Sequence, residues 1–181
     1  MAVDKLFWID MEMTGLDVEK EVIIEVAAII TDWEFKELDT YHAVIKQPQE
    51  YIDRMDAWNT EHHGASGLTA AIPSGKDQSL VEHEMLAMIS KHFGSSNKER
   101  PIIAGNSIAQ DRLFITKYMK SLNEALHYRM LDVSSWKIVF NEMYKIKYEK
   151  QNTHRALDDI RESIAELKYY LGRMNPTPKP T

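Results

Sequence analysis

Cysteine is absent from the 181 residues. Its absence excludes disulfide bonds and thiolate zinc sites, and it fits a reducing compartment. Long hydrophobic runs are absent too: the longest apolar stretch, Val22 to Ile30, is too short to cross a bilayer and contains Glu25. The first residues show neither a signal peptide nor a transit peptide. We therefore expect a cytoplasmic protein.

Basic residues are scarce relative to acidic ones. The chain has 28 Asp and Glu against 22 Lys and Arg, a net charge of −6, and no run of Lys or Arg exceeds two. A protein that binds long nucleic acid usually presents a basic face, because neutralising the phosphates releases counterions and so favours binding. If the substrate is a nucleic acid, it should be short and held partly by metal ions.

Proline and glycine are also few, with six and seven residues. The length and the 44% hydrophobic content suit one globular domain over residues 1–174. Residues 175–181 (NPTPKPT) cannot continue a helix, and we expect a disordered tail there.

The apolar pattern predicts an α/β fold. Strands are expected over residues 6–10, 21–32 and 35–46, which favours a three-strand antiparallel meander. Residues 47–75 read as an irregular stretch. The later part alternates helix and strand, with helices over 80–93, 110–119, from 134 or 135 to 144 and from 154, and strands over 101–106 and 131–133.

Three local patterns carry the acids that we single out. Asp10 and Glu12 follow an apolar strand at spacing i, i+2, which places both carboxylates on one face. Two solvated acids at a strand end are the alternative. In residues 106–111 (NSIAQD), Asp111 can reach over the end of a neighbouring strand, or these polar residues simply cap the helix.

The third pattern is His154 with Asp158, spaced i, i+4 and thus on one face of a helix. Asp158 can instead have a structural role, because an acid in the first turn interacts favourably with the helix dipole, and His154 can be a structural residue at the start of the helix. Taken together, four acids from three separate elements would concentrate a charge of about −4, which requires cations and fits two Mg²⁺ or Mn²⁺ ions. His154 has a pKa suited to accept a proton near neutrality.

Five segments resemble a known family. Residues 8–16 (WIDMEMTGL), 105–112 (GNSIAQDR) and 153–163 (THRALDDIRES) resemble the DEDD-type 3′→5′ exonucleases with a histidine base. Within that superfamily, residues 56–68 and 127–134 (HYRMLDVS) are most similar to the oligoribonuclease family.

The resemblance implies an RNase H-like mixed sheet flanked by helices, and a homodimer. It also implies two divalent metals, Mg²⁺ or Mn²⁺, held by Asp10, Glu12, Asp111 and Asp158. His154 would be the general base. The expected activity is hydrolysis of short oligoribonucleotides, chiefly 5′-phosphorylated dinucleotides, to mononucleotides.

The resemblance further implies a substrate-binding set. Leu16 and Trp58 would pack against the two bases of a dinucleotide, where stacking needs no sequence preference. A core role for Trp58 and an ordinary surface role for Leu16 are the alternatives. The set is completed by His63 and Gln110.

A cap on the 5′ phosphate is implied by the same resemblance. It would consist of Ser107, Arg129 and Ser134, with Tyr128 reaching across from the partner subunit. Such a cap would exclude longer chains, which agrees with the acidic net charge. A structural ion pair is the alternative for Arg129, and a structural role is the alternative for the serines.

Three other classes of protein remain open at this stage. A sister exonuclease acting on longer RNA or on DNA would need an open basic channel, which the sequence does not show. A catalytically silent dinucleotide-binding module would have lost a metal carboxylate. A structural protein would merely carry these acids on its surface.

Overall fold

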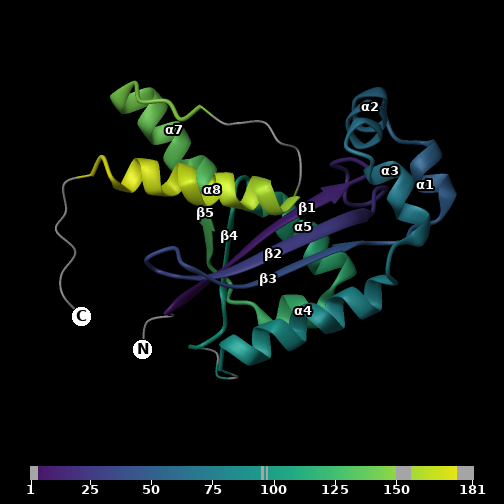
Figure 1. Cartoon of the computed structure of the whole chain (residues 1–181), viewed down its shortest axis with the longest axis horizontal. Coiled ribbons are helices and arrows are strands. Elements are labelled where there is room, and N and C mark those ends of the chain that lie inside the picture. The colour runs from purple at the N-terminus through teal and green to yellow at the C-terminus, as the bar shows by residue number, and fades with distance from the viewer. Residues whose placement is uncertain (1–3, 95, 97, 150–155, 175–181) are drawn as a thin grey trace.

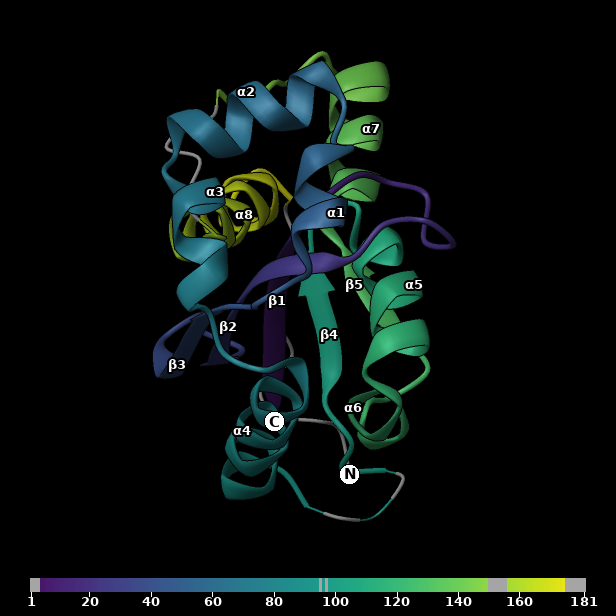
Figure 2. The same cartoon turned by 90° about the vertical axis from the view of Figure 1, so that its right-hand side faces the viewer.

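Five strands form one mixed sheet at the centre of the computed structural model, which describes residues 4–94, 96, 98–149 and 156–174 (Figure 1). They are β1 (Lys5–Met13), β2 (Ile23–Asp32), β3 (Glu37–Val44), β4 (Ile102–Gly105) and β5 (Met130–Asp132). Their order across the sheet is β3-β2-β1-β4-β5 (Figure 2). The first three strands pair antiparallel, as predicted. β4 pairs parallel with β1, and β5 pairs parallel with β4. The predicted mixed sheet is confirmed.

Helices cover both faces of the sheet, and the central strand β1 is accordingly apolar on both sides. Phe7, Ile9 and Met11 face one layer of helices, while Leu6 and Trp8 face the other. The first layer contains α4 (Gln78–His92), α5 (Ile108–Tyr118) and α6 (Lys120–Ala125). The second contains α7 (Val133–Tyr144) and α8 (Ala156–Leu171) (Figure 1).

Residues 47–75 are more regular than the sequence suggests. They form α1 (Gln49–Asp53), α2 (Ala57–Ala65), α3 (Leu68–Ala71) and the 3₁₀ turn η1 (Ile72–Ser74). Each segment has nine residues or fewer, so too few apolar positions repeat for a helical period to show. They are held by packing: Ile52, Leu68 and Ile72 cover Val22 and Ile24 of the β2 region. These segments gather at the end of the sheet toward which β1 points (Figure 1).

Some predictions fall outside the described residues. The tail at 175–181 and His154, where the last helix was expected to begin, belong to this group. In the part of the chain that is described, no helix combines the length and the apolar character needed to span a bilayer.

Candidate active site

The β1 strand carries the first two acids. Strand alternation puts Asp10 and Glu12 on the same face as Leu6 and Trp8, the face that α8 covers. The strand continues to Met13, beyond the predicted end at Asp10, so both carboxylates are fixed by sheet pairing. Their common face, predicted from the i, i+2 spacing, is thereby confirmed.

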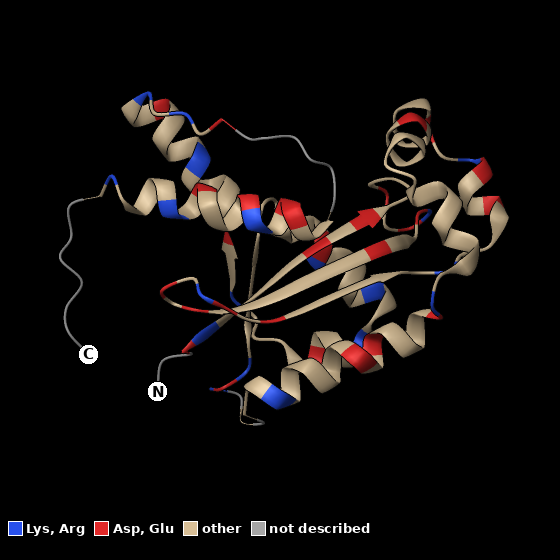
Figure 3. Ribbon diagram, viewed as in Figure 1, with Lys and Arg blue, Asp and Glu red and all other residues tan. Residues whose placement is uncertain are grey.

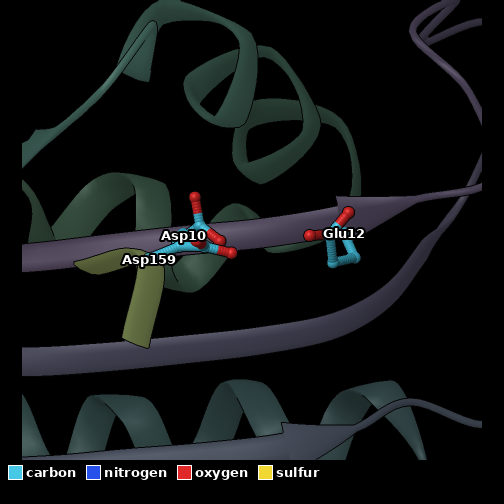
Figure 4. Close-up of side chains that lie close together, drawn as sticks. All are labelled: Asp10, Glu12 and Asp159. Carbon is cyan, nitrogen blue, oxygen red and sulfur yellow. The ribbon is translucent and has the colours of Figure 1, made fainter. Parts of the chain in front are cut away.

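The third acid of this group comes from α8 and is Asp159. One carboxylate oxygen from each of Asp10, Glu12 and Asp159 lies within 4.8 Å of the other two. Figure 4 shows Asp10 and Asp159 next to each other in this view and Glu12 further along β1. Among the described residues, this is the one group of three or more potential metal ligands that meets this distance.

Asp158, the predicted ligand, does not join this group. Its side chain is 49% exposed, and its Oδ1 lies 3.5 Å from Nη1 of Arg161. Successive residues of a helix are about 100° apart around its axis, so only one of two neighbouring acids can face the sheet. Ala156, Ile160 and Ile164 mark the buried face of α8. Asp158 lies nearly opposite that face, whereas Asp159 flanks it, and this helical pattern was readable in the sequence.

Asp111 reaches the same strand from the other helix layer. It lies in the first turn of α5, is buried, and its Oδ1 accepts a hydrogen bond from the backbone N–H of Met11 at 3.0 Å. Burial is the main cause that raises the pKa of Asp111 to about 8. Asp111 therefore reaches over the neighbouring strand β1, as expected. It does not belong to the group formed by Asp10, Glu12 and Asp159.

Glu25 is a fourth carboxylate on this face, which the sequence reasoning missed. It pairs with Glu12 across β1 and β2, and its Oε1 lies 2.6 Å from Nε2 of His42 on β3. Burial raises the pKa of Glu12 to about 7, and Glu25 and Asp159 contribute to the rise. A single acid inside an otherwise apolar strand was the signal for Glu25. Figure 3 shows acidic positions on β1, on β2 and at the start of α8.

The donor set fits a hard divalent cation. All three converging ligands are carboxylate oxygens, the atoms that Mg²⁺ and Mn²⁺ prefer. With Mg–O bonds of about 2.1 Å, ligands on opposite sides of one ion are about 4 Å apart. Small side-chain adjustments therefore suffice for Asp10, Glu12 and Asp159 to share an ion.

Two apolar side chains stand exposed near this end of the sheet. Leu16, in the loop after β1, is 76% exposed, and Trp58, on α2, is 66% exposed. The core role for Trp58 is thus excluded. The ring of His62 stacks on Trp58, with centroids 4.5 Å apart and planes 13° apart. Gln110 donates from Nε2 to the carbonyl oxygen of Leu16 at 2.7 Å and so ties this loop to α5.

His63 is buried beside the end of β1. Its Nε2 lies 3.0 Å from the carbonyl oxygen of Met13, and since a carbonyl only accepts, Nε2 carries the proton. Burial lowers the pKa of His63. The ring of His63 thus fastens α2 to the strand that carries Asp10 and Glu12.

The predicted phosphate-cap serines lie side by side. The Oγ atoms of Ser107 and Ser134 are 3.2 Å apart, and the backbone N–H of Ser107 donates to Ser134 Oγ and to Asp132 Oδ1, each at 3.0 Å. Nearby in sequence, the Arg129 guanidinium lies over the ring of Tyr128, 5.4 Å from its centre. Tyr128 itself is 74% exposed.

Comparisons with known proteins agree with one another on the family. The family described as Exonuclease (RNase_T) matches residues 7–167. A protein named Oligoribonuclease from Ectopseudomonas mendocina is 45% identical over 92% of this chain and 94% of its own. Relatives named Oligoribonuclease from Arabidopsis thaliana and Oligoribonuclease, mitochondrial, from Homo sapiens are 43% and 42% identical, covering 91% and 92% of this chain and 76% and 71% of theirs.

Solved structures show the same fold. The E. coli exonuclease I complex with single-stranded DNA, in its zinc-bound form, and the exonuclease I of Methylocaldum szegediense both align with a TM-score of 0.72. The alignments cover 94% of this chain at 15% identity. This chain spans 41% of the length of those two proteins.

Proposed function

The chain belongs to the exonuclease family, in its oligoribonuclease branch, and from this premise we propose that it hydrolyses short RNA from the 3′ end. The preferred substrates are 5′-phosphorylated dinucleotides, and the products are mononucleotides. The observation that carries the proposal is the convergence of Asp10, Glu12 and Asp159 at the end of β1. Three carboxylates so close together suit the metal-assisted displacement at phosphorus that such a nuclease performs.

The metal ligands in this proposal are Asp10, Glu12, Asp111 and Asp159. Asp159 replaces Asp158 because it faces β1, while Asp158 faces Arg161. Two Mg²⁺ or Mn²⁺ ions bound there would stabilise the negative charge that develops during an in-line displacement. The carboxylates would hold these ions, and the hydrogen bond from the backbone N–H of Met11 orients Asp111.

The reaction needs one base. The oxygen of a water molecule bonds to phosphorus while the bond from phosphorus to the 3′ oxygen breaks, and the 3′ oxygen takes up a proton from solvent water. The proton lost by the water goes to His154, which we assign as general base from its sequence context. His154 lies outside the described residues.

Substrate length is set by groups at two places. Leu16 and the stacked pair of Trp58 and His62 offer exposed apolar faces to the bases. Ser107 and Ser134, with Arg129, offer donors for a terminal phosphate. A substrate held at its bases and at a capped 5′ phosphate has no room for further nucleotides at that end.

We further propose a homodimer in which Tyr128 acts across the interface. Support comes from α7, whose outer side exposes large apolar side chains of Ile138, Val139, Met143 and Tyr144. Several exposed large apolar side chains on one helix favour an interface between subunits. We expect Ile138→Glu combined with Met143→Glu to give a monomer in light scattering, with reduced activity because Tyr128 no longer reaches its partner's site.

A substrate-length series tests the proposal. With Mn²⁺ present, the protein should cleave a 5′-phosphorylated diribonucleotide far faster than a ten-nucleotide RNA. Equal turnover of the two would contradict the short-substrate assignment and favour a sister exonuclease. His154→Ala should lose most of the rate and keep most of the dinucleotide binding, whereas Asp10→Ala acting as fast as wild type would contradict the metal mechanism.

A further inference from the structure

One side-chain amide at the end of β4 connects the two helices that flank it. Asn106 accepts at Oδ1 from the hydroxyl of Ser134 on α7, at 3.2 Å. Its Nδ2 donates to Ser163 Oγ at 2.7 Å and to Glu166 Oε2 at 3.3 Å, both on α8. The donor and acceptor atoms of the amide are thus used in opposite directions, which fixes its orientation.

Glu166 anchors this amide from the interior. Its side chain is fully buried, and its Oε1 accepts from the hydroxyl of Tyr170, also fully buried, at 2.9 Å. Burial and the bond to Glu166 raise the pKa of Tyr170, so its hydroxyl remains protonated and donates. A buried carboxyl group costs free energy unless donors satisfy it, so Glu166 favours the orientation of Asn106 in which Nδ2 donates to it.

The backbone before and after Asn106 is equally constrained. A Cβ atom at Gly105 would lie 2.8 Å from the carbonyl oxygen of Ile9, so only glycine lets β4 approach β1 this closely. Ser107 has φ 52°, a left-handed conformation that is uncommon for residues other than glycine. This conformation directs its N–H to Ser134 Oγ at 3.0 Å. Ser134 Oγ is therefore held by Ser107 and by Asn106 together.

We propose that Asn106, anchored by Glu166, is a positioning residue that pre-organises Ser134 to receive the 5′ phosphate of the substrate. When the phosphate binds, the Ser134 proton is shared between Asn106 Oδ1 and a phosphate oxygen, so the bond that fixes the Ser134 side chain is kept in the complex. The N–H of Ser107 holds the same oxygen. The inference rests on the proposed function and assigns Asn106 and Glu166 to the part of the site that selects substrates by their 5′ end.

The test compares two dinucleotides that differ only in a 5′ phosphate or a 5′ hydroxyl. For Asn106→Ala, the preference in kcat/KM for the phosphorylated one should fall about tenfold, the size of one lost hydrogen-bonding arrangement. Turnover of the 5′-hydroxyl dinucleotide should fall by a much smaller factor than that of the phosphorylated one, and the rise in Tm with Mn²⁺ should be unchanged. In an Ser134→Ala background, Asn106→Ala should have little further effect on the preference, because it acts through Ser134.

Asn123→Ala is the matched control. Its amide accepts from Thr116 on the other face of the sheet, at 3.2 Å, and its removal should leave the preference intact. If Asn106→Ala does not fold, Asn106→Ser and Glu166→Gln replace it, since neither keeps the whole arrangement, and both should lower the preference. An equal loss for both dinucleotides, or additive effects with Ser134→Ala, would overturn the inference. Wild-type protein inactive on both dinucleotides would instead contradict the proposed function.

Discussion

Asp10 and Asp159 meet across the sheet face that α8 covers, each with a carboxylate oxygen within 4.8 Å of the other. Asp10 is fixed by the pairing of β1 with β2, where it lies opposite Ala27. Asp159 is fixed by the packing of α8, whose Ile160 joins the same buried cluster as Trp8. The pairing of β1 and the packing of α8 on the same sheet therefore bring the two carboxylates together.

The neighbouring acids of α8 give a matched pair of substitutions. Asp159→Asn should lower kcat on a dinucleotide by roughly 100-fold or more, because it removes a metal ligand. Asp158→Asn should remain near wild type, since Asp158 faces Arg161 and solvent. Steady-state kinetics with Mn²⁺ at a fixed concentration measure both. The opposite ranking would restore Asp158 as the ligand and contradict the geometry of α8.

Divalent metal should stabilise the fold. Ions that bind the folded state and relieve repulsion among Asp10, Glu12 and Asp159 raise its free energy of unfolding by mass action, about 2.7 kcal/mol at 100 times Kd. We expect Mn²⁺ to raise Tm by several degrees, and EDTA to reverse the rise. Asp159→Asn should lose most of the effect and Asp158→Asn should keep it. A wild-type Tm insensitive to millimolar Mn²⁺ would favour the view of these acids as plain surface groups.

The stacked pair of Trp58 and His62 should act as one platform for a base. Trp58→Ala should weaken dinucleotide binding by about 1–3 kcal/mol, the usual contribution of one stacking side chain. His62→Ala removes the ring that supports Trp58 from behind, so it should weaken binding by a smaller amount. His62→Phe keeps a flat ring and should restore the affinity. Binding is best measured with Ca²⁺ to suppress turnover, and a His62→Phe variant as weak as His62→Ala would exclude a role of the ring stack.

The Asp39 cluster should make stability depend on acid pH. Asp39 Oδ2 lies 2.8 Å from both Lys91 Nζ and His92 Nε2, a link between β3 and the end of α4. Its bonds to Lys91 and then His92 lower the pKa of Asp39 from 3.8 to about 2. Because the folded-state pKa lies below the unfolded value, the stabilisation is present above pH 4 and is lost as pH falls towards 2.

Asp39→Asn isolates that contribution. At pH 7 the variant should unfold at lower urea concentration, by no more than about 1 kcal/mol, because the cluster is near the surface and water screens it. The difference from wild type should shrink as pH falls below 4, and it should also shrink in high salt. A difference that stayed constant from pH 7 to pH 3 would assign the effect to packing.

Much of the fold followed from short-range patterns. The apolar runs of β1 and β2 predicted the antiparallel strands, and the i, i+2 spacing predicted the common face of Asp10 and Glu12. Strand geometry repeats every two residues, so this inference needs no knowledge of what packs against the strand. The helical segments between 49 and 74 were not predictable in the same way, because each is too short to show a period and is held by contacts with Val22 and Ile24.

The sequence by itself determined which residue types were available: oxygen ligands without thiols, in a chain with more acidic than basic residues. Tertiary structure decided which acids meet. It turned Asp159 rather than Asp158 toward β1, and it placed Glu25 beside Glu12 and Asp111 against Met11. The physical reason is that the apolar pattern of α8 shows which face of the helix is buried, but only the packing of that face on the sheet sets which strand and which carboxylates its acids meet.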